Sequence, residues 1–250
     1  MSHQTADGYD PSGDAREVVP DVYTISQRKG GRIHAFLLDD AGALTLVDSL
    51  YDTDGALVVG AIERMGKKIK DLKHIVLTHA HRSHIGGVAA LKKLSGAKLW
   101  AHEWESDIIA GERKSQTTTY VPKWPWRVYP IQLGLQLGVD GHAPCEVDAF
   151  AREGDSIGPL QIIHAPGHSP GHLAMYWKQR SAVFAGDALA TWPALSLGWP
   201  GLTLNGKQNL RSLHKIDDLR ADVIAVGHGE PATGDQIDKL RRLIRSGEIH

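Results

Sequence analysis

Residues 75–87 read "IVLTHAHRSHIGG". An apolar run typical of a buried strand leads into His79, His81 and His84, and a glycine pair then opens a segment with helical spacing. In extended backbone, residues two apart face the same side, so His79 and His81 present their imidazoles together. His84 approaches from the start of the following helix. Because imidazole is the commonest metal ligand in proteins, this stretch predicts a metal site at the end of a strand.

Three further apolar strands end in side chains that can bind a metal. They read "LQIIHAPGH" up to His168, "AVFAGD" up to Asp187 and "VIAVGHGEP" around His228. A glycine precedes each of these residues and allows a sharp backbone turn, which places the side chain at the rim of a sheet. Ligands at strand ends can converge on one edge of a sheet, where a rigid scaffold holds them. We therefore expect these side chains to gather at one site.

The order and spacing of these motifs resemble the metallo-β-lactamase superfamily, including its glyoxalase II-like and lactonase-like hydrolases. The resemblance covers nearly all of the chain from about residue 20, and it includes Asp48 in "LVDS", which is similar to an early structural motif of the family. It implies an α/β fold, a four-layer αββα sandwich of two mixed β-sheets flanked by helices. Strand-like runs in both halves of the chain, each accompanied by helix-like segments, favour the same architecture.

The resemblance also implies a set of metal ligands. At the matching positions, His79, His81 and His168 would bind a first metal, Asp187 would bridge, and His84 and His228 would bind a second. The implied cofactor is zinc, as one or two ions, with iron or manganese as alternatives. Three neutral imidazoles and one carboxylate are also a credible zinc or iron site on chemical grounds.

The resemblance breaks at Ser83, where most members carry an aspartate that completes the second metal site. Two divalent ions at the ~3.5–4 Å typical of two-metal centres would here share one protein carboxylate, and their mutual repulsion would weaken the second site. We predict a tightly bound first metal and a weaker second one. The Ser83 hydroxyl could bind weakly, support a water molecule, or cap the helix that follows.

The implied function is that of a metal-dependent hydrolase acting on a small-molecule substrate. A metal-bound hydroxide, available because the ion lowers the pKa of its water to around 7, would cleave an ester, thioester or lactone. Asp187 and Ser83 are the candidate catalytic residues. Two alternatives stay open: a mononuclear iron dioxygenase acting on persulfide-type sulfur, and a metal-binding member of the fold without turnover. β-Lactamase activity is disfavoured because the N-terminus lacks the apolar core of a signal peptide.

Composition limits the partners that we expect. The net charge is -1 over 250 residues and no dense Lys/Arg cluster occurs, which disfavours nucleic acid as a partner. No apolar run approaches the ~18 residues of a membrane span, so we expect no membrane partner. The single cysteine, Cys145, fits a reducing compartment, and we predict a cytoplasmic protein. The oligomeric state is left open.

The chain is expected to divide into a flexible N-terminal arm over residues 1–18 and one domain over residues 19–250. Residues 112–146 are rich in aromatic residues and proline with little periodicity, which predicts an inserted loop. Near the motifs, we expect His172 to orient a ligand, Asp48 to tie loops together through hydrogen bonds, and Arg82 to be solvated. Trp192 and Trp199 would either wall the metal site or cover the core.

Overall fold

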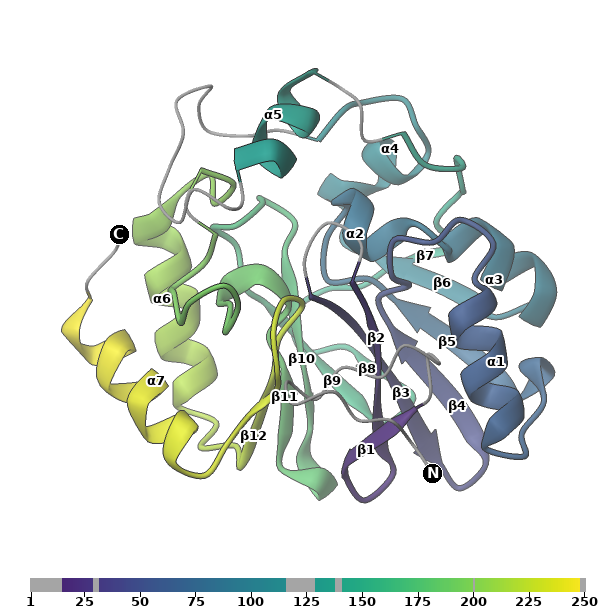
Figure 1. Ribbon diagram of the computed structural model, residues 1–250, viewed down its shortest axis with the longest axis horizontal. Helices are drawn as coiled ribbons and strands as arrows, with labels where there is room; N and C mark the ends of the chain where they lie inside the picture. Colours follow the sequence, from purple (N-terminus) through teal and green to yellow (C-terminus); the bar gives the residue numbers. More distant parts are fainter. Residues whose placement is uncertain (1–14, 29–31, 116–128, 138–140, 200, 248–250) are drawn as a thin grey trace.

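Two mixed β-sheets pack face to face, with helices on the outer side of each (Figure 1). The computed structural model describes residues 15–28, 32–115, 129–137, 141–199 and 201–247. The first sheet has the strand order β1 (Arg16–Val19), β2 (Val22–Gln27), β3 (Ile33–Asp40), β4 (Ala43–Val47), β5 (Leu72–Val76), β6 (Lys98–Ala101) and β7 (Ala149–Phe150). The second has the order β13 (Ala232–Thr233), β12 (Val223–Ala225), β11 (Ala182–Phe184), β10 (Leu173–Trp177), β9 (Leu160–His164) and β8 (Ser156–Ile157). The predicted αββα sandwich is confirmed.

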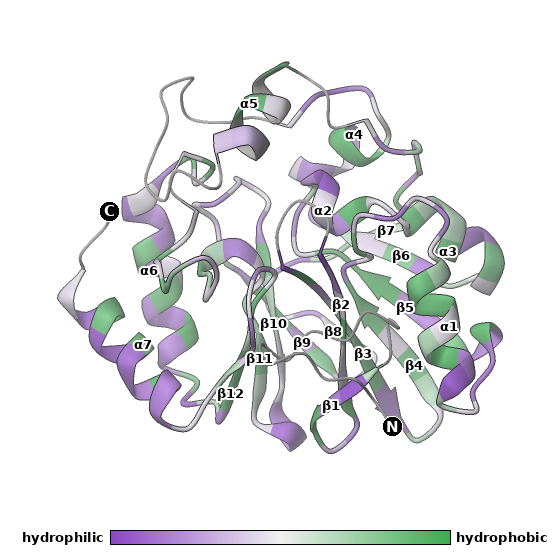
Figure 2. Ribbon diagram, in the orientation of Figure 1, coloured by the Kyte–Doolittle hydropathy of each residue, from purple (hydrophilic) through white to green (hydrophobic). Residues whose placement is uncertain are grey.

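The two-residue period of the strands determines which side chains form the core between the sheets. In β3, Phe36 and Leu38 belong to this core, whereas Leu37 between them packs into the core on the outer face. In β10, Met175 lies between the sheets and its neighbour Ala174 lies on the outer face. Successive side chains of a strand point to opposite faces, and both faces are covered here, so most residues on both faces of the central strands are apolar. In Figure 2 the hydrophobic colour appears on strands such as β4 and β5 and also on parts of the helices that cover them, such as α1 and α3.

Helices cover the outer faces of both sheets. The helices α1 (Ala56–Arg64) and α3 (Val88–Ser95) lie over the first sheet, and α6 (Gly206–Asp217) and α7 (Asp235–Ser246) lie over the second (Figure 1). The apolar stripe of α7 is Ile237, Leu240 and Ile244, three buried residues at helical spacing. The shorter helical elements are α2 (Arg82–Ile85), α4 (Ser106–Ile109), α5 (Tyr129–Leu137) and 3₁₀ turns at Ile69–Asp71, Glu103–Glu105, Lys178–Arg180 and Gly186–Ala188.

Strand pairing brings the segments with predicted ligands to one edge of the sandwich. Both β9 and β11 run antiparallel to β10, and β11 is parallel to β12, so β9, β11 and β12 share one direction. Their carboxyl ends therefore lie at the same edge, and each leads into a predicted ligand. The end of β5 in the first sheet reaches the same place, because the Leu173 N–H donates to the Thr78 carbonyl at 2.8 Å.

Two features of the predicted organisation differ in the structure. Residues 1–14 lie outside the described residues, but Arg16–Val19 form β1, which pairs with β2, so residues 16–18 belong to the sheet rather than to an arm. Within the predicted insertion at 112–146, Tyr129–Leu137 form α5. The rest of that segment includes residues 116–128 and 138–140, which also lie outside the described residues.

None of the helices in the described part of the chain has the length and hydrophobicity that crossing a membrane requires.

Candidate metal centre

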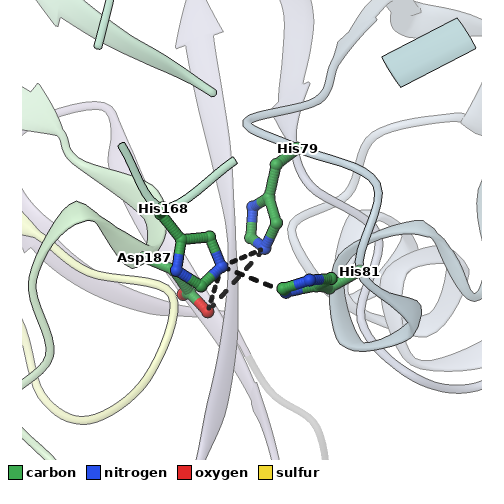
Figure 3. A group of neighbouring side chains, drawn as sticks. All are labelled: His79, His81, His168 and Asp187. Atoms are coloured by element: carbon green, nitrogen blue, oxygen red, sulfur yellow. Dashed lines mark hydrogen bonds and ion pairs between the residues drawn. The ribbon is translucent and has the colours of Figure 1, made fainter. Parts of the chain in front are cut away.

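Four buried side chains form a compact group at the edge where the strands end (Figure 3). His79 and His81 follow β5, His168 follows β9, and Asp187 follows β11. His168 Nε2 lies 3.2 Å from His79 Nε2, 3.0 Å from His81 Nδ1 and 3.8 Å from Asp187 Oδ2. Figure 3 shows the three imidazoles converging beside the carboxylate. Side chains from both sheets thus meet at one point.

These separations fit a bound divalent cation. Nitrogen ligands of a tetrahedral zinc, at about 2.0–2.1 Å from the ion, lie roughly 3.4 Å from one another. Thr78 Oγ1 lies 3.0 Å from His79 Nδ1 and 2.8 Å from a carboxylate oxygen of Asp48, to which it donates its proton. The threonine must therefore accept the Nδ1 proton of His79, and the lone pair of His79 Nε2 is left facing His168 and Asp187. Nitrogen and carboxylate lone pairs that face one another in a buried space are unfavourable unless a cation lies between them.

Asp187 belongs to a second group as well, together with His84 from α2 and His228 after β12. His84 Nε2 lies 3.4 Å from Asp187 Oδ1, and His228 Nε2 lies 3.4 Å from Asp187 Oδ2. In the described part of the protein, His84 Nε2 and Asp187 Oδ1 are buried and make no hydrogen bond. Two buried polar atoms that face each other without a hydrogen bond fit a second cation site beside the first.

The carboxylate of Asp48 orients one histidine of each group. It accepts hydrogen bonds from His84 Nδ1 and from the Thr78 backbone N–H, both at 2.8 Å, and from the Thr78 hydroxyl. Through that hydroxyl it also determines which nitrogen of His79 is protonated. Partners of this kind fix the tautomer and the ring orientation of metal-binding histidines. The predicted role of Asp48 in tying the loops together is confirmed.

His172 and two glycines position Asp187. His172 Nε2 accepts the backbone N–H of Asp187 at 3.1 Å, and burial lowers the pKa of His172 to about 3, so the ring acts as a neutral acceptor. This hydrogen bond is the kind of contact expected of a residue that orients Asp187. Gly186 has a φ of 52°, and a Cβ there would lie 2.7 Å from His172 Nε2. At Gly227 a Cβ would overlap Asp187 Oδ1, so this glycine is required for space.

The electrostatics of this edge favour positive charge beside Asp187. Burial, reinforced by neighbouring imidazoles, holds the pKa of His79 and of His168 well below the usual value. Burial also opposes the protonation of His84, but the carboxylates of Asp187 and Asp48 outweigh it and raise the pKa of His84 to about 10. Without a metal, a proton on His84 therefore supplies positive charge where a second cation would lie.

A sequence profile of the metallo-beta-lactamase superfamily matches residues 28–228, which is most of the chain and includes every residue of both groups. The chain belongs to this superfamily. Among its relatives is the hydroxyacylglutathione hydrolase GloC of Haemophilus influenzae, which is 25% identical over 198 residues, 75% of this chain and 84% of that protein.

Solved structures of the superfamily share the fold. The metallo-beta-lactamase family protein TTHA1429 from Thermus thermophilus superposes with a TM-score of 0.65 at 25% identity, covering 92% of this chain and 81% of that one. TTHA1623, solved in a di-iron-bound form, gives a TM-score of 0.61 at 23% identity, covering 85% of this chain and 94% of that one. Superfamily membership and the His/Asp groups together indicate a metallo-hydrolase that binds divalent metal.

The six predicted ligands of this superfamily member lie together, and Ser83 lies beside them on α2. Ser83 is half-buried and is the second residue of the helix, whose N-cap is His81, so the interpretation of Ser83 as the cap is wrong. Among the described His, Cys, Asp and Glu residues, the second group contains one carboxylate, Asp187, which it shares with the first. The two groups therefore share one carboxylate.

Arg82 is buried, and the prediction that it is solvated is wrong. Its Nε donates to the Gly141 carbonyl at 2.7 Å, and its guanidinium lies 4.3 Å from the centre of the Tyr51 ring. Both Gly141 and Tyr51, which help to bury Arg82, are distant from it in the sequence. Of the two tryptophans, Trp199 is buried with its ring centre 4.3 Å from that of His228, so it packs directly on a predicted ligand.

Glu105, for which no motif predicted a role, connects two ligand segments. Its buried carboxylate accepts hydrogen bonds from the Ala80 N–H at 3.0 Å, the Ser169 hydroxyl at 2.7 Å and the Gly171 N–H at 3.0 Å. Ala80 separates His79 from His81, and Ser169 follows His168. Burial raises the pKa of this carboxyl, while the hydrogen bonds act in the opposite direction. The contacts join residues far apart in the chain, so no local sequence pattern marks Glu105.

Replacing Glu105 by glutamine should lower the free energy of unfolding by about 1–3 kcal/mol, because the new amide N–H₂ must face one of the three donors. Urea unfolding of the metal-free protein measures this loss, and Glu103→Gln, an exposed neighbour 3.9 Å from Arg152, is the matched control. Equal stability of the two variants would show that Glu105 does not hold the ligand segments together.

Proposed function

We propose that the protein is a zinc-dependent hydrolase that cleaves ester, thioester or lactone bonds of small molecules. The observation that carries the proposal is the buried group of His79, His81, His168 and Asp187, with Asp187 shared by a second, less complete group. These side chains and His84 and His228 are the proposed metal ligands. Hydrolysis of a thioester is also the activity implied by the name of the relative hydroxyacylglutathione hydrolase.

In the proposed reaction, the metal ion and the protein side chains have different roles. A divalent ion supplies Lewis acidity and lowers the pKa of a bound water. Asp187 holds its carboxylate between both groups, and Asp48 and His172 keep the ligands and that carboxylate in place. Ser83 offers a hydroxyl where a carboxylate would pass a proton to the leaving group. The chain is therefore suited to leaving groups that depart without protonation, such as thiolates and phenolates.

A series of substrates with one acyl group and different leaving groups tests this proposal. We expect kcat/KM for the thioester, the phenyl ester and the activated lactone to exceed that for the matched amide by about 100-fold or more, since general acid catalysis contributes roughly 10²–10⁴-fold. Each substrate is assayed with zinc, manganese, cobalt and iron while oxygen consumption is recorded. Oxygen uptake with a persulfide and iron, without hydrolysis, would instead identify a dioxygenase; equal turnover of the amide would contradict the role given to Ser83.

The variant Ser83→Asp should bind more metal than the unmodified protein. It adds a carboxylate to the second group, which reduces the repulsion between two adjacent cations. We expect the content after exhaustive dialysis to rise from about one ion per chain to about two, as measured by mass spectrometry of the metals. Ser83→Asn, which adds similar volume without charge, is the control. Two tightly held ions in the unmodified protein would contradict the predicted weakness of the second site.

A further inference from the structure

The ring of His228 is positioned differently from the rings of other predicted ligands. A side-chain oxygen lies 2.8–3.3 Å from the Nδ1 atom of three of them, which are His79, His84 and His168. In the described part of the chain, the Nδ1 atom of His228 is buried and makes no hydrogen bond. A hydrogen bond at the second nitrogen is the usual means of orienting a metal-binding imidazole. The position of the His228 ring therefore depends on its backbone and on packing against Trp199.

The backbone on both sides of His228 is bound to the first sheet, although β12, which leads to His228, belongs to the second. The His34 N–H donates to the Gly227 carbonyl at 2.9 Å. The Gly229 N–H donates to the Arg32 carbonyl at 3.0 Å. The residues before and after His228 are thus fixed by the start of β3, and a shift between the two sheets at this edge would move the imidazole.

Glu230, two residues after His228, adds a side-chain contact to the first sheet. Its Oε2 accepts a hydrogen bond from Arg16 Nη2 at 2.6 Å, and its Oε1 lies 3.9 Å from His34 Nε2. Arg16 is the first residue of β1, and both β1 and β3 run antiparallel to β2, so β1 and β3 begin at the same edge. The Glu230 carbonyl also accepts the Thr191 hydroxyl at 2.8 Å. Glu230 is thus held through its side chain and its backbone.

We propose that Arg16 is a positioning residue for the second metal site. By holding Glu230 it fixes the backbone of His228 and keeps His228 Nε2 turned toward Asp187 Oδ2, which lies 3.4 Å away. The inference rests on the proposed function for the assignment of His228 as a metal ligand. Neither Arg16 nor Glu230 is a ligand itself, so both act only through His228. The N-terminal strand β1 thereby contributes to metal binding, although every predicted ligand lies beyond residue 78.

A second ion pair provides a matched control at the opposite edge of the sandwich. Asp21, in the turn between β1 and β2, pairs with Arg180, which follows β10. This pair also joins the N-terminal strands to the second sheet, and its side chains are about as exposed as those of Arg16 and Glu230. Because β10 runs antiparallel to β9, it ends at the edge away from the metal centre. A variant of Arg180 therefore loses an equivalent ion pair at a distance from His228.

The affinity for the second zinc tests the proposal in the Ser83→Asp background, by competition with a chelating indicator after the first site is loaded. We expect Arg16→Gln to weaken the second zinc by about three- to fivefold, the upper part of what a partly exposed ion pair contributes, and to leave the first unchanged. Glu230→Gln should cause the same loss, and the double variant should bind no more weakly than either single one. Arg180→Gln should change neither affinity. Equal affinities of Arg16→Gln and Arg180→Gln for the second zinc would overturn the proposal.

Hydrogen exchange of the metal-free protein, followed by NMR, gives a readout that does not depend on the metal. The amides of His34 and Gly229 should exchange about three- to fivefold faster in Arg16→Gln than in Arg180→Gln, because the bonds on either side of His228 open more often. Identical exchange in the two variants would show that Arg16 does not hold this segment. Retention of the second zinc by His228→Ala would contradict the ligand assignment in the proposed function, and the amide exchange would still decide whether Arg16 positions the segment.

Discussion

The variant Asp187→Asn is expected to lose both metals. Asp187 is the one carboxylate common to the two groups of potential ligands, with an oxygen within 3.4–3.8 Å of nitrogens of His79, His84, His168 and His228. Asparagine keeps the shape and removes the negative charge that offsets two cations. Because changes to residues that only support ligands already lower metal affinity by about 10–100-fold, loss of a shared ligand should exceed about 100-fold.

Metal content after dialysis against a chelator measures this effect, and hydrolysis should fall in parallel. The matched control is Asp222→Asn. Asp222 is an exposed aspartate just before β12, so this variant loses the same charge at a position away from the site. Retention of metal by Asp187→Asn at the level of the control would refute the assignment of Asp187 as the shared ligand, whatever happens to activity.

The variant Asp48→Asn should weaken both metal sites although Asp48 belongs to neither group. One oxygen of Asp48 accepts from both His84 Nδ1 and the Thr78 hydroxyl, and the other accepts from the Thr78 backbone N–H, so an asparagine amide with one oxygen and one N–H₂ group cannot accept from all three donors. If the N–H₂ group takes the place of Oδ1 it faces the Thr78 backbone N–H and disturbs the segment that leads to His79; if it takes the place of Oδ2 it faces His84 Nδ1 and the Thr78 hydroxyl, and the tautomers of His84 and His79 are no longer fixed. We expect metal affinity to fall by about 10–100-fold, the range seen when partners of ligating histidines are removed.

Chelator competition measures the affinity, and urea unfolding of the metal-free variant measures the accompanying loss of stability. Asp40→Asn, at the exposed end of β3, is the control. A variant that is less stable but binds metal within twofold of the unmodified protein would show that Asp48 supports the fold alone. NMR detection of the Nδ1 proton of His84 gives an independent readout, because a structural role alone does not require that tautomer.

Much of the candidate site could be predicted because its signals are local. In β3 and β10, side chains alternate between the two faces of the sheet with a period of two residues, and this alternation does not depend on how the strands pair. Each predicted ligand stands a few residues after an apolar strand, so the strand identifies it. The role of Asp48 was expected from the resemblance of "LVDS" to an early motif of the superfamily, and the structure places Asp48 directly after β4.

The burial of Arg82 and the role of Glu105 were not predicted because both depend on contacts between distant segments. Arg82 lies 59 residues from Gly141, to which it donates, and Glu105 lies 25 and 64 residues from Ala80 and Ser169. Neither separation leaves a periodic pattern in the sequence. Serine is a favourable residue at a helix N-cap, but the helix begins at Arg82, so the N-cap is His81 and Ser83 lies within the helix. Propensity at one position gives way to tertiary geometry in such cases.

By itself the sequence determined the two sheets and the edge on which the predicted ligands stand, because strand periodicity and strand ends are properties of short stretches. The tertiary structure alone decided that His79 turns its Nε2 toward His168 and Asp187, that Glu105 joins two ligand segments, and that Arg82 and Lys114 line a common cavity. Those features arise from hydrogen bonds and packing between parts of the chain that meet only when the sheets close on each other.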